Sequence, residues 1–200
     1  MDAKYDMDVY DEHYRRSSIN VIDLLKISNT LQEGHFVLTS GLHSNKYFQC
    51  AKLLQYPDMT QRICSDIVKY FYPNIIDTVL SPALGGIIAG YEVARQIGIR
   101  NIFAERKNYD LELRRGFDIK QGERVLIIED VITTGGSVFE LLDIVKEHGG
   151  KTVGIGCIIN RASSFINFGI EFFWAYKADV QKFKPSDCEL CKKHIPITQK

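Results

Sequence analysis

The stretch RVLIIEDVITTGGS, residues 124–137, decides the fold of this chain. The apolar run at residues 125–128 is typical of a parallel strand that is buried on both faces. From residue 138 to residue 148, apolar side chains recur with the spacing of a helix stripe, and a pair of glycines then provides a stop. The stretch therefore predicts a strand, a polar loop and a helix, which form one unit of an alternating α/β fold.

The loop between this strand and this helix carries groups that suit an anion and a sugar. The hydroxyls of Thr133 and Thr134 and the backbone amides up to Ser137 can converge at the helix N-terminus. Glu129 and Asp130, at the end of the strand, only accept hydrogen bonds when they are ionised. Amides for phosphate beside carboxylates for hydroxyls predict a sugar-phosphate site. The alternative is an ordinary strand with a Thr/Gly turn, although a turn needs only one glycine.

Composition limits the kinds of partner that we expect. The 200 residues are 45% hydrophobic, so one compact domain can bury roughly 70% of the unfolded chain's surface. The 25 basic and 25 acidic residues cancel, which argues against a nucleic-acid partner. The sequence has no apolar run of membrane-spanning length and no signal-peptide centre, so we expect no membrane partner. Scattered cysteines, odd in number, favour a reducing, cytoplasmic location.

The remaining segments extend the alternating pattern. We expect a helix over residues 19–33 capped by Ser18, extended segments 35–39 and 46–53 joined by a hairpin-like turn, and a second helix capped by Asp58. Further strands and helices then alternate, at residues 78–80, 87–97, 101–104, 125–128, 138–148 and 153–159, with an edge strand at 171–176. This order predicts a parallel sheet with helices on both faces and a ligand crevice beyond the carboxyl ends of its strands.

Two further loops reach that crevice. In SPALGG, residues 81–86, Gly85 and Gly86 let the backbone approach a ligand closely, although a simple turn between strand and helix is the alternative. Residues 105–123 form a charged loop too long for a plain connection. Its cations suit a polyanionic substrate, although a solvated charged hairpin is the alternative; they are Arg106, Lys107, Arg114 and Arg115.

The 124–137 stretch resembles the signature of the type I phosphoribosyltransferases, which bind phosphoribosyl pyrophosphate (PRPP). SGLHSNKYFQCAKL at residues 40–53 and NRASS at residues 160–164 resemble pieces of the orotate phosphoribosyltransferases within that group. The resemblance implies one domain over residues 1–200, with a sheet core at about 58–165 and a small hood at about 18–57 and 166–200. It implies transfer of ribose 5-phosphate from PRPP to orotate, giving orotidine 5′-phosphate and pyrophosphate in UMP synthesis.

The resemblance also assigns roles to residues. Those expected to bind PRPP are Glu129, Asp130, Val131, Ile132, Thr133, Thr134, Gly135, Gly136, Ser137, Ala83, Leu84, Gly85 and Gly86. Those expected to bind orotate are Thr133, Arg161, Tyr47 and Phe48. A planar guanidinium such as that of Arg161 suits the orotate carboxylate, although a surface ion pair is the alternative. For Tyr47 and Phe48, core packing is the alternative.

The resemblance further implies the catalytic groups and the partners. The catalytic set would be Arg106, Lys107, Asp130 and Glu129, with Arg114 and Arg115 adding charge to a closing lid. Mg²⁺ would accompany the phosphates of PRPP, and the chain would form a homodimer. Two other functions stay open, namely transfer to another nucleobase and a non-catalytic regulator that senses PRPP.

The chain departs from the family pattern at several positions. Thr39 and Gly85 stand where many orotate enzymes have lysine, and residues 108–113 contain neither the lysine nor the histidine of the usual lid. Near the C-terminus, Cys188 and Cys191 lie close to His194, but structural zinc sites need four ligands, so a packed segment is favoured over a metal site. Other histidines show no constellation and are expected in surface or hydrogen-bonded positions; they are His13, His35, His43 and His148.

Overall fold

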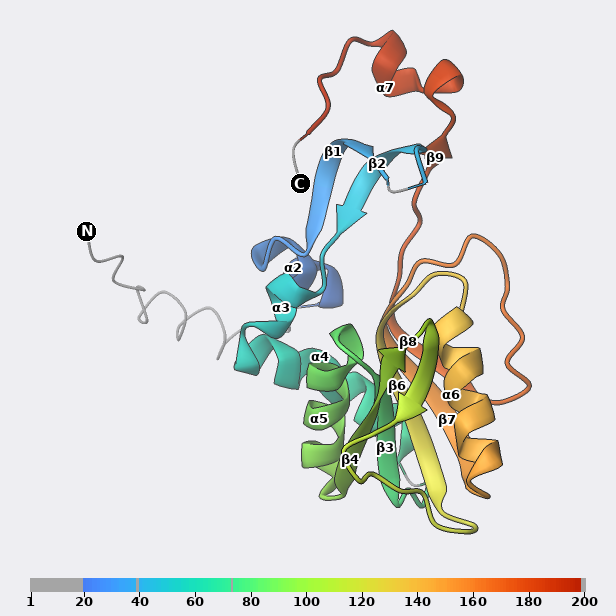
Figure 1. Cartoon of the computed structure of the whole chain (residues 1–200). Coiled ribbons are helices and arrows are strands. Elements are labelled where there is room, and N and C mark those ends of the chain that lie inside the picture. Colours follow the sequence, from blue (N-terminus) through green and yellow to red (C-terminus); the bar gives the residue numbers. More distant parts are fainter. Residues whose placement is uncertain (1–19, 39, 73, 199–200) are drawn as a thin grey trace.

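The computed structural model describes residues 20–38, 40–72 and 74–198, and it contains two β-sheets (Figure 1). The larger sheet holds β3 (Thr78–Pro82), β4 (Arg100–Lys107), β5 (Asp110–Leu113), β6 (Arg124–Ile132), β7 (Lys151–Asn160) and β8 (Phe172–Lys177). The smaller sheet holds β1 (Leu31–Val37), β2 (His43–Phe48) and β9 (Lys182–Phe183). The helices are α2 (Val21–Ile27), α3 (Ala51–Leu54), α4 (Pro57–Phe71), α5 (Gly85–Ile97), α6 (Gly136–Glu147) and α7 (Glu189–Lys192), with a 3₁₀ turn at Pro185–Asp187.

The larger sheet has the strand order β5-β4-β3-β6-β7-β8. Every neighbouring pair in it is parallel except β4 with β5, which form an antiparallel hairpin. The predicted parallel sheet is therefore confirmed, and so is the edge strand near the C-terminus, which is β8. Because β8 falls inside residues 166–200, that segment contributes to both sheets rather than to the hood alone.

Helices cover both faces of the larger sheet, as predicted (Figure 1). Along β6 the buried side chains alternate between the faces. Val125 and Ile127 belong to the apolar cluster that contains the buried residues of α6, whereas Leu126 and Ile128 belong to the cluster that contains those of α4 and α5. A strand that is buried on both faces explains why the sequence reads there as a continuous apolar run.

The longest described helix, α4, shows how the local sequence sets an element. Pro57 occupies its first turn, where a missing N–H costs nothing, so Asp58 lies in the first turn rather than at the predicted cap. Ile63, Ile67 and Phe71 recur every four residues and are buried. Among the described helices, none is both long and apolar enough to cross a membrane.

The predicted helix over residues 19–33 is wrong in its second half. The helix α2 is capped by Asn20, whose side chain accepts from the Asp23 amide at 3.0 Å, and it ends at Ile27. Asn29 then takes a left-handed conformation with φ 55°, and Leu31 begins β1. Leu31 fits a helix stripe and a strand equally well, so the apolar pattern extended the predicted helix too far. The predicted cap Ser18, like Thr39 and His13, lies outside the described residues.

The smaller sheet is built on the predicted hairpin, since β1 pairs antiparallel with β2. The expected extended segment 46–53 ends early, because β2 stops at Phe48 and residues 51–54 turn into α3. The C-terminal segment completes this sheet through β9, which pairs with β2. The prediction that His35 and His43 belong to no constellation is wrong. Both are buried beside Cys188 and Cys191, whereas His194 is exposed.

Candidate functional site

Three segments of the candidate site follow the carboxyl ends of neighbouring parallel strands. Residues 83–86 follow β3, residues 133–137 follow β6, and Arg161 follows β7. Since β6 lies between β3 and β7, these ends meet at one edge of the sheet. The Arg161 amide donates to the Ile132 carbonyl at 2.7 Å, which fixes Arg161 beside the start of the Thr/Gly loop. Two of these segments, residues 83–86 and 133–137, were expected at this edge, and Arg161 joins them there.

The Thr/Gly loop encloses a small polar hollow at the N-terminus of α6. The hollow has a volume of about 70 Å³, and it is lined by Glu129, Val131, Ile132, Thr133, Thr134, Gly135, Gly136, Ser137 and Val138. Gly135 is the cap of α6 with φ 81°, a conformation that other residues adopt only with strain. The first amides of a helix have no partner within it and carry the positive end of its dipole. The hollow is therefore suited to a tetrahedral oxyanion.

The acidic pair lies within β6 rather than in the loop. Glu129 is buried, and its Oε1 accepts from the Asp130 amide at 3.0 Å. The Asp130 side chain likewise binds the amide of the residue that follows it, since its Oδ1 accepts from the Val131 amide at 2.8 Å. Burial raises the pKa of Glu129, and the neighbouring Asp130 carboxyl raises this pKa further. The raised pKa favours the protonated form of Glu129, and a cation or a hydroxyl-bearing ligand could replace that proton.

The SPALGG loop passes directly against this acidic pair. A Cβ built on Gly85 would lie 2.7 Å from both carboxylate oxygens of Asp130, and one built on Gly86 would lie 3.1 Å from Glu129 Oε1. A side chain at position 85 would therefore meet the Asp130 carboxylate, which would have to move. The peptide bond between Ala83 and Leu84 is cis, and the Leu84 side chain is exposed.

Arg161 has a donor that the described protein leaves unpaired. Its Nε is buried and has no hydrogen-bond partner among the described residues. Its guanidinium lies 5.9 Å from the centre of the Phe48 ring. Burial lowers the pKa of Arg161, while the nearby Tyr47 side chain acts in the opposite direction. A cavity of about 320 Å³ opens beside it, lined in part by Lys177 and Lys182.

Tyr47 and Phe48 lie on opposite faces of β2. Phe48 is buried in the apolar core, as the packing alternative anticipated, although Arg161 covers its ring. Tyr47 is half-buried, and its ring centre lies 5.5 Å from that of Phe36. Only Tyr47 of the two therefore has a partly open side chain close to Arg161.

Sequence reasoning missed two residues that support Arg161. Asn160 and Lys177 are paired across the ends of β7 and β8. The buried Asn160 Oδ1 accepts from the Ala162 amide at 3.0 Å and from Lys177 Nζ at 3.1 Å. Lys177 also donates to the Ala162 carbonyl at 2.8 Å. These bonds fix the backbone on both sides of Arg161, and a lysine directly after the predicted edge strand was the available signal.

The first half of the charged loop is a hairpin, which was the alternative considered for this segment. The strand β4 extends to Lys107, and Asn108 and Tyr109 turn the chain with positive φ into β5. Main-chain pairing between β4 and β5 satisfies the backbone groups that an open loop would leave to water.

Most of the predicted lid cations already have partners within the chain. Arg106 pairs with Glu140 of α6 at 2.8 Å, and Lys107 pairs with Glu112 at 3.4 Å. Arg115 pairs with Glu105 at 2.7 Å. In the part of the chain that the structure describes, Arg114 has no ion pair. The hairpin is therefore held against α6, and none of these cations lines the polar hollow at the N-terminus of α6.

The comparisons with known proteins agree with this geometry. Residues 53–166 match the phosphoribosyl transferase domain family. The orotate phosphoribosyltransferase of Caldicellulosiruptor bescii is 47% identical over 178 residues, which are 89% of this chain and 94% of that protein. The orotate phosphoribosyltransferase of Chlorobium phaeobacteroides is 45% identical over 177 residues, 88% of this chain and 92% of that protein.

Solved structures share the fold at lower identity. The orotate phosphoribosyltransferase of Aeropyrum pernix matches 78% of this chain and 93% of its own, with a TM-score of 0.69 and 18% identity. The UMP synthase of Leishmania donovani matches 86% of this chain with a TM-score of 0.67 and 21% identity, and the match spans 38% of that longer protein.

Proposed function

Because the chain belongs to the orotate phosphoribosyltransferase family, we propose that it transfers the 5-phosphoribosyl group of PRPP to orotate. The products are orotidine 5′-phosphate and pyrophosphate, and the reaction serves pyrimidine synthesis. The chain covers nearly the full length of its curated relatives, so the whole activity is attributed to this one domain.

The observation that carries the proposal is the unpaired Nε of Arg161 beside the phosphate hollow. A buried guanidinium donor without a partner is costly unless a ligand completes it. A carboxylate is the matching acceptor, because it can take parallel hydrogen bonds from the planar guanidinium. Orotate carries such a carboxylate, whereas uracil does not. Arg161 therefore supports orotate as the acceptor and would orient its ring nitrogen toward the sugar.

The remaining site residues support the PRPP side of the reaction. We assign the 5′-phosphate to the hollow formed by residues 133–137 at the N-terminus of α6. Glu129 and Asp130 would accept from the ribose hydroxyls and stabilise positive charge on the sugar as the bond to pyrophosphate breaks. The backbone at Gly85 and Gly86 would line the pyrophosphate position. No covalent nucleophile is needed, so catalysis rests on positioning and electrostatics.

Magnesium is part of the proposal. Two adjoining carboxyl groups, one of them with a raised pKa, fit a site that receives a hard cation together with a polyphosphate. Mg²⁺ would be held mainly by oxygens of PRPP, with Glu129 and Asp130 as the protein groups able to share it. When bound, the ion neutralises charge on the departing pyrophosphate.

The lid, the homodimer and the cytoplasmic location are also proposed. Arg106 and Lys107 would exchange their partners Glu140 and Glu112 for pyrophosphate. Both ion pairs are partly solvent-exposed, and exposed pairs contribute little, about 0–1 kcal/mol, so this exchange costs little. In a homodimer, the hairpin of one chain could reach the site of its neighbour.

A panel of acceptors tests the function. The purified protein is mixed with PRPP, Mg²⁺ and one of four bases, and pyrophosphate release is followed. We expect release with orotate and none above background with uracil, adenine or hypoxanthine. Release with another base in place of orotate would assign a different acceptor. If none of the four bases caused release, the protein would be a family member that lacks the proposed activity.

A further inference from the structure

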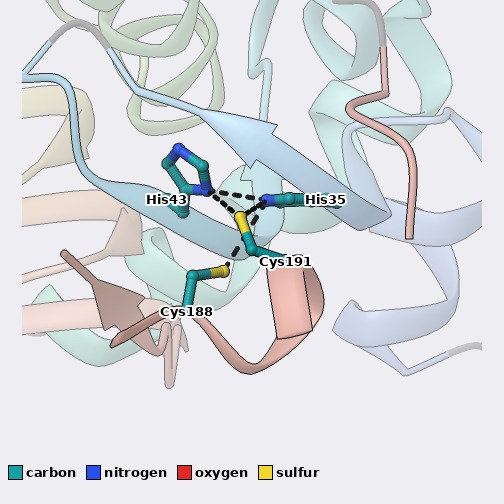
Figure 2. A group of neighbouring side chains, drawn as sticks. All are labelled: His35, His43, Cys188 and Cys191. Atoms are coloured by element: carbon teal, nitrogen blue, oxygen red, sulfur yellow. Dashed lines mark hydrogen bonds between the residues drawn. The ribbon is translucent and has the colours of Figure 1, made fainter. Parts of the chain in front are cut away.

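A second cluster of reactive side chains lies in the smaller sheet, apart from the site described above. Figure 2 shows His35, His43, Cys188 and Cys191 pointing toward one another. One ligand atom of each residue lies within 4.8 Å of all the others. Three of these residues are buried and Cys191 is half-buried. The two histidines come from the β1–β2 hairpin and the two cysteines from the segment around α7 (Figure 2).

The three nitrogen–sulfur distances in this cluster are close to those around a single tetrahedral ion. Cys188 Sγ and Cys191 Sγ each lie 3.6 Å from His35 Nε2, and Cys191 Sγ lies 3.3 Å from His43 Nδ1. Nitrogen and sulfur ligands of tetrahedral zinc stand about 3.6 Å apart, given their bond lengths to the metal. The two imidazole nitrogens are 2.7 Å apart. Two zinc-bound nitrogens stand about 3.3 Å apart, so the rings would separate by about 0.6 Å on binding.

The hydrogen bond on the far side of His35 prepares its ring for a metal. His35 Nδ1 lies 2.7 Å from the Ile195 carbonyl oxygen, which can only accept. Nδ1 therefore carries the proton, and Nε2 directs a lone pair into the cluster. Metal-bound histidines typically donate their other N–H to a carbonyl or carboxylate in this way.

Hydrogen bonding alone does not satisfy this arrangement. His35 Nε2 offers one lone pair, yet His43 Nδ1 and both cysteine sulfurs converge on it. Only one of these three groups can use the lone pair as a donor. A cation at the centre satisfies all four ligand atoms at once, and all the cysteines are free rather than disulfide-bonded.

We propose that His35, His43, Cys188 and Cys191 form a structural zinc site. Two thiolates and two imidazoles in a tetrahedral set select zinc, whereas Mg²⁺ prefers oxygen ligands. The set is too compact for a two-iron cluster, because no two of the four ligand atoms are more than 4.8 Å apart. The set is closed, with four protein ligands and no open position, which is typical of structural rather than catalytic zinc.

The ion joins two parts of the chain that little else connects. His35 and Cys188 are 153 positions apart in sequence. Of residues 184–198, only Cys188 is buried, and none of these residues belongs to either apolar core. The hydrogen bonds between this segment and β1 include one from the Thr198 amide to the His35 carbonyl at 2.6 Å. A segment without an apolar core needs another source of stability, and metal binding supplies it.

The site also steadies the strand that carries Tyr47. His43 and Tyr47 both belong to β2, and β9 pairs with β2 at His43. Fixing His43 to the C-terminal segment therefore holds the hairpin in register next to the proposed orotate pocket.

The test uses the full-length protein purified without chelators. We expect close to one zinc per chain by elemental analysis. Replacing zinc with Co²⁺ should give the visible bands of a tetrahedral ion and a thiolate charge-transfer band in the near ultraviolet. Cys191→Ser and His43→Ala should lose both the ion and these bands. Trypsin should cut the metal-free protein faster than the zinc-loaded protein after Lys192 and Lys193, which are exposed.

Two matched variants separate metal binding from simple folding effects. His194→Asn removes the nearby exposed histidine and keeps a residue that tolerates its φ of 53°, so zinc content should not change. His43→Cys supplies a thiolate in place of the imidazole, and it should retain a bound ion that His43→Ala loses.

Several results would overturn the proposal. One is that the purified protein contains no zinc and also fails to bind Co²⁺ after reduction. Another is a disulfide between Cys188 and Cys191 in freshly purified protein. The third is that His194→Asn loses as much zinc as Cys191→Ser. None of these measurements depends on orotate turnover. The zinc proposal could therefore be tested even if the proposed enzymatic function were wrong.

Discussion

Among single residues, Glu129 has the most unusual environment for its charge. It is a buried carboxyl beside a second carboxyl, and burial raises its pKa above the ordinary value. At pH values between the unfolded and the folded pKa of Glu129, the folded state therefore keeps a proton on Glu129 that the unfolded chain releases. For such a group, stability is complete below the unfolded pKa and is lost as pH rises toward the folded pKa.

This sign gives a prediction for the free protein. Glu129→Gln keeps the shape of the side chain and removes its ionisation. Between about pH 5 and pH 8, the free energy of unfolding should fall more steeply with pH in the original protein than in the variant, by up to about 1.4 kcal/mol per pH unit. Urea titrations across this range measure both slopes. The exposed Glu147→Gln is the control, and identical slopes for Glu129→Gln and the original protein would refute a retained proton.

Arg161 gives the corresponding prediction for catalysis. Arg161→Ala should lower kcat/KM for orotate, because a desolvated carboxylate would lose its partner. The fall should correspond to a loss of about 2–5 kcal/mol in transition-state stabilisation. Arg161→Lys should recover only part of this loss, since an ammonium cannot form two parallel hydrogen bonds. Steady-state kinetics with saturating PRPP measure the effect. Unchanged orotate kinetics in Arg161→Ala would remove Arg161 from the orotate site.

Among the elements, the β4–β5 hairpin is proposed to contact pyrophosphate, whereas in the structure it contacts α6. Arg106 and the Leu111 amide both bind the Glu140 carboxylate, which holds the hairpin on α6. If Arg106 acts on pyrophosphate, Arg106→Ala should lower kcat, whereas Glu140→Gln should leave kcat close to that of the original protein. Equal losses in both variants would show that Arg106 serves only to hold the hairpin in place.

The sequence predicted those elements that follow a single clear period. The buried run at 125–128 and the stripe of α6 were recognised because nothing competes with their patterns. Two kinds of feature escaped. Leu31 fits both a helix and a strand, so its element depends on contacts with the smaller sheet. Glu129 and Asp130 look like loop residues, yet β6 continues through them because it pairs with β7 as far as Ile132.

The candidate sites differ in the same way. The residues proposed to bind PRPP fall in two short segments, 83–86 and 129–137, so local patterns were enough to propose them. His35 and Cys188 meet only through tertiary structure, and no local spacing indicates that two hairpin histidines will face a C-terminal cysteine pair. His194 was nearer in sequence and was the wrong candidate. Asn160 and Lys177 likewise become partners only when β7 and β8 pair.

For the molecule as a whole, the proposed homodimer would let the hairpin serve a neighbouring site. Arg106→Ala and Asp130→Asn chains, each of which we expect to have little activity alone, are mixed under conditions that exchange subunits. Random exchange should restore about a quarter of the original sites, because half of the dimers are hybrids with one complete site each. No recovery, with hybrids verified by mass, would place Arg106 in the site of its own chain.

The account depends on one anion-binding hollow with carboxylates beside it, and a calorimetric titration of PRPP with Mg²⁺ examines that hollow. We expect saturable binding of one PRPP per chain, weakened strongly in Asp130→Asn and little changed in Arg161→Ala, which lies on the acceptor side. Absence of PRPP binding by protein that is folded by circular dichroism would contradict the account.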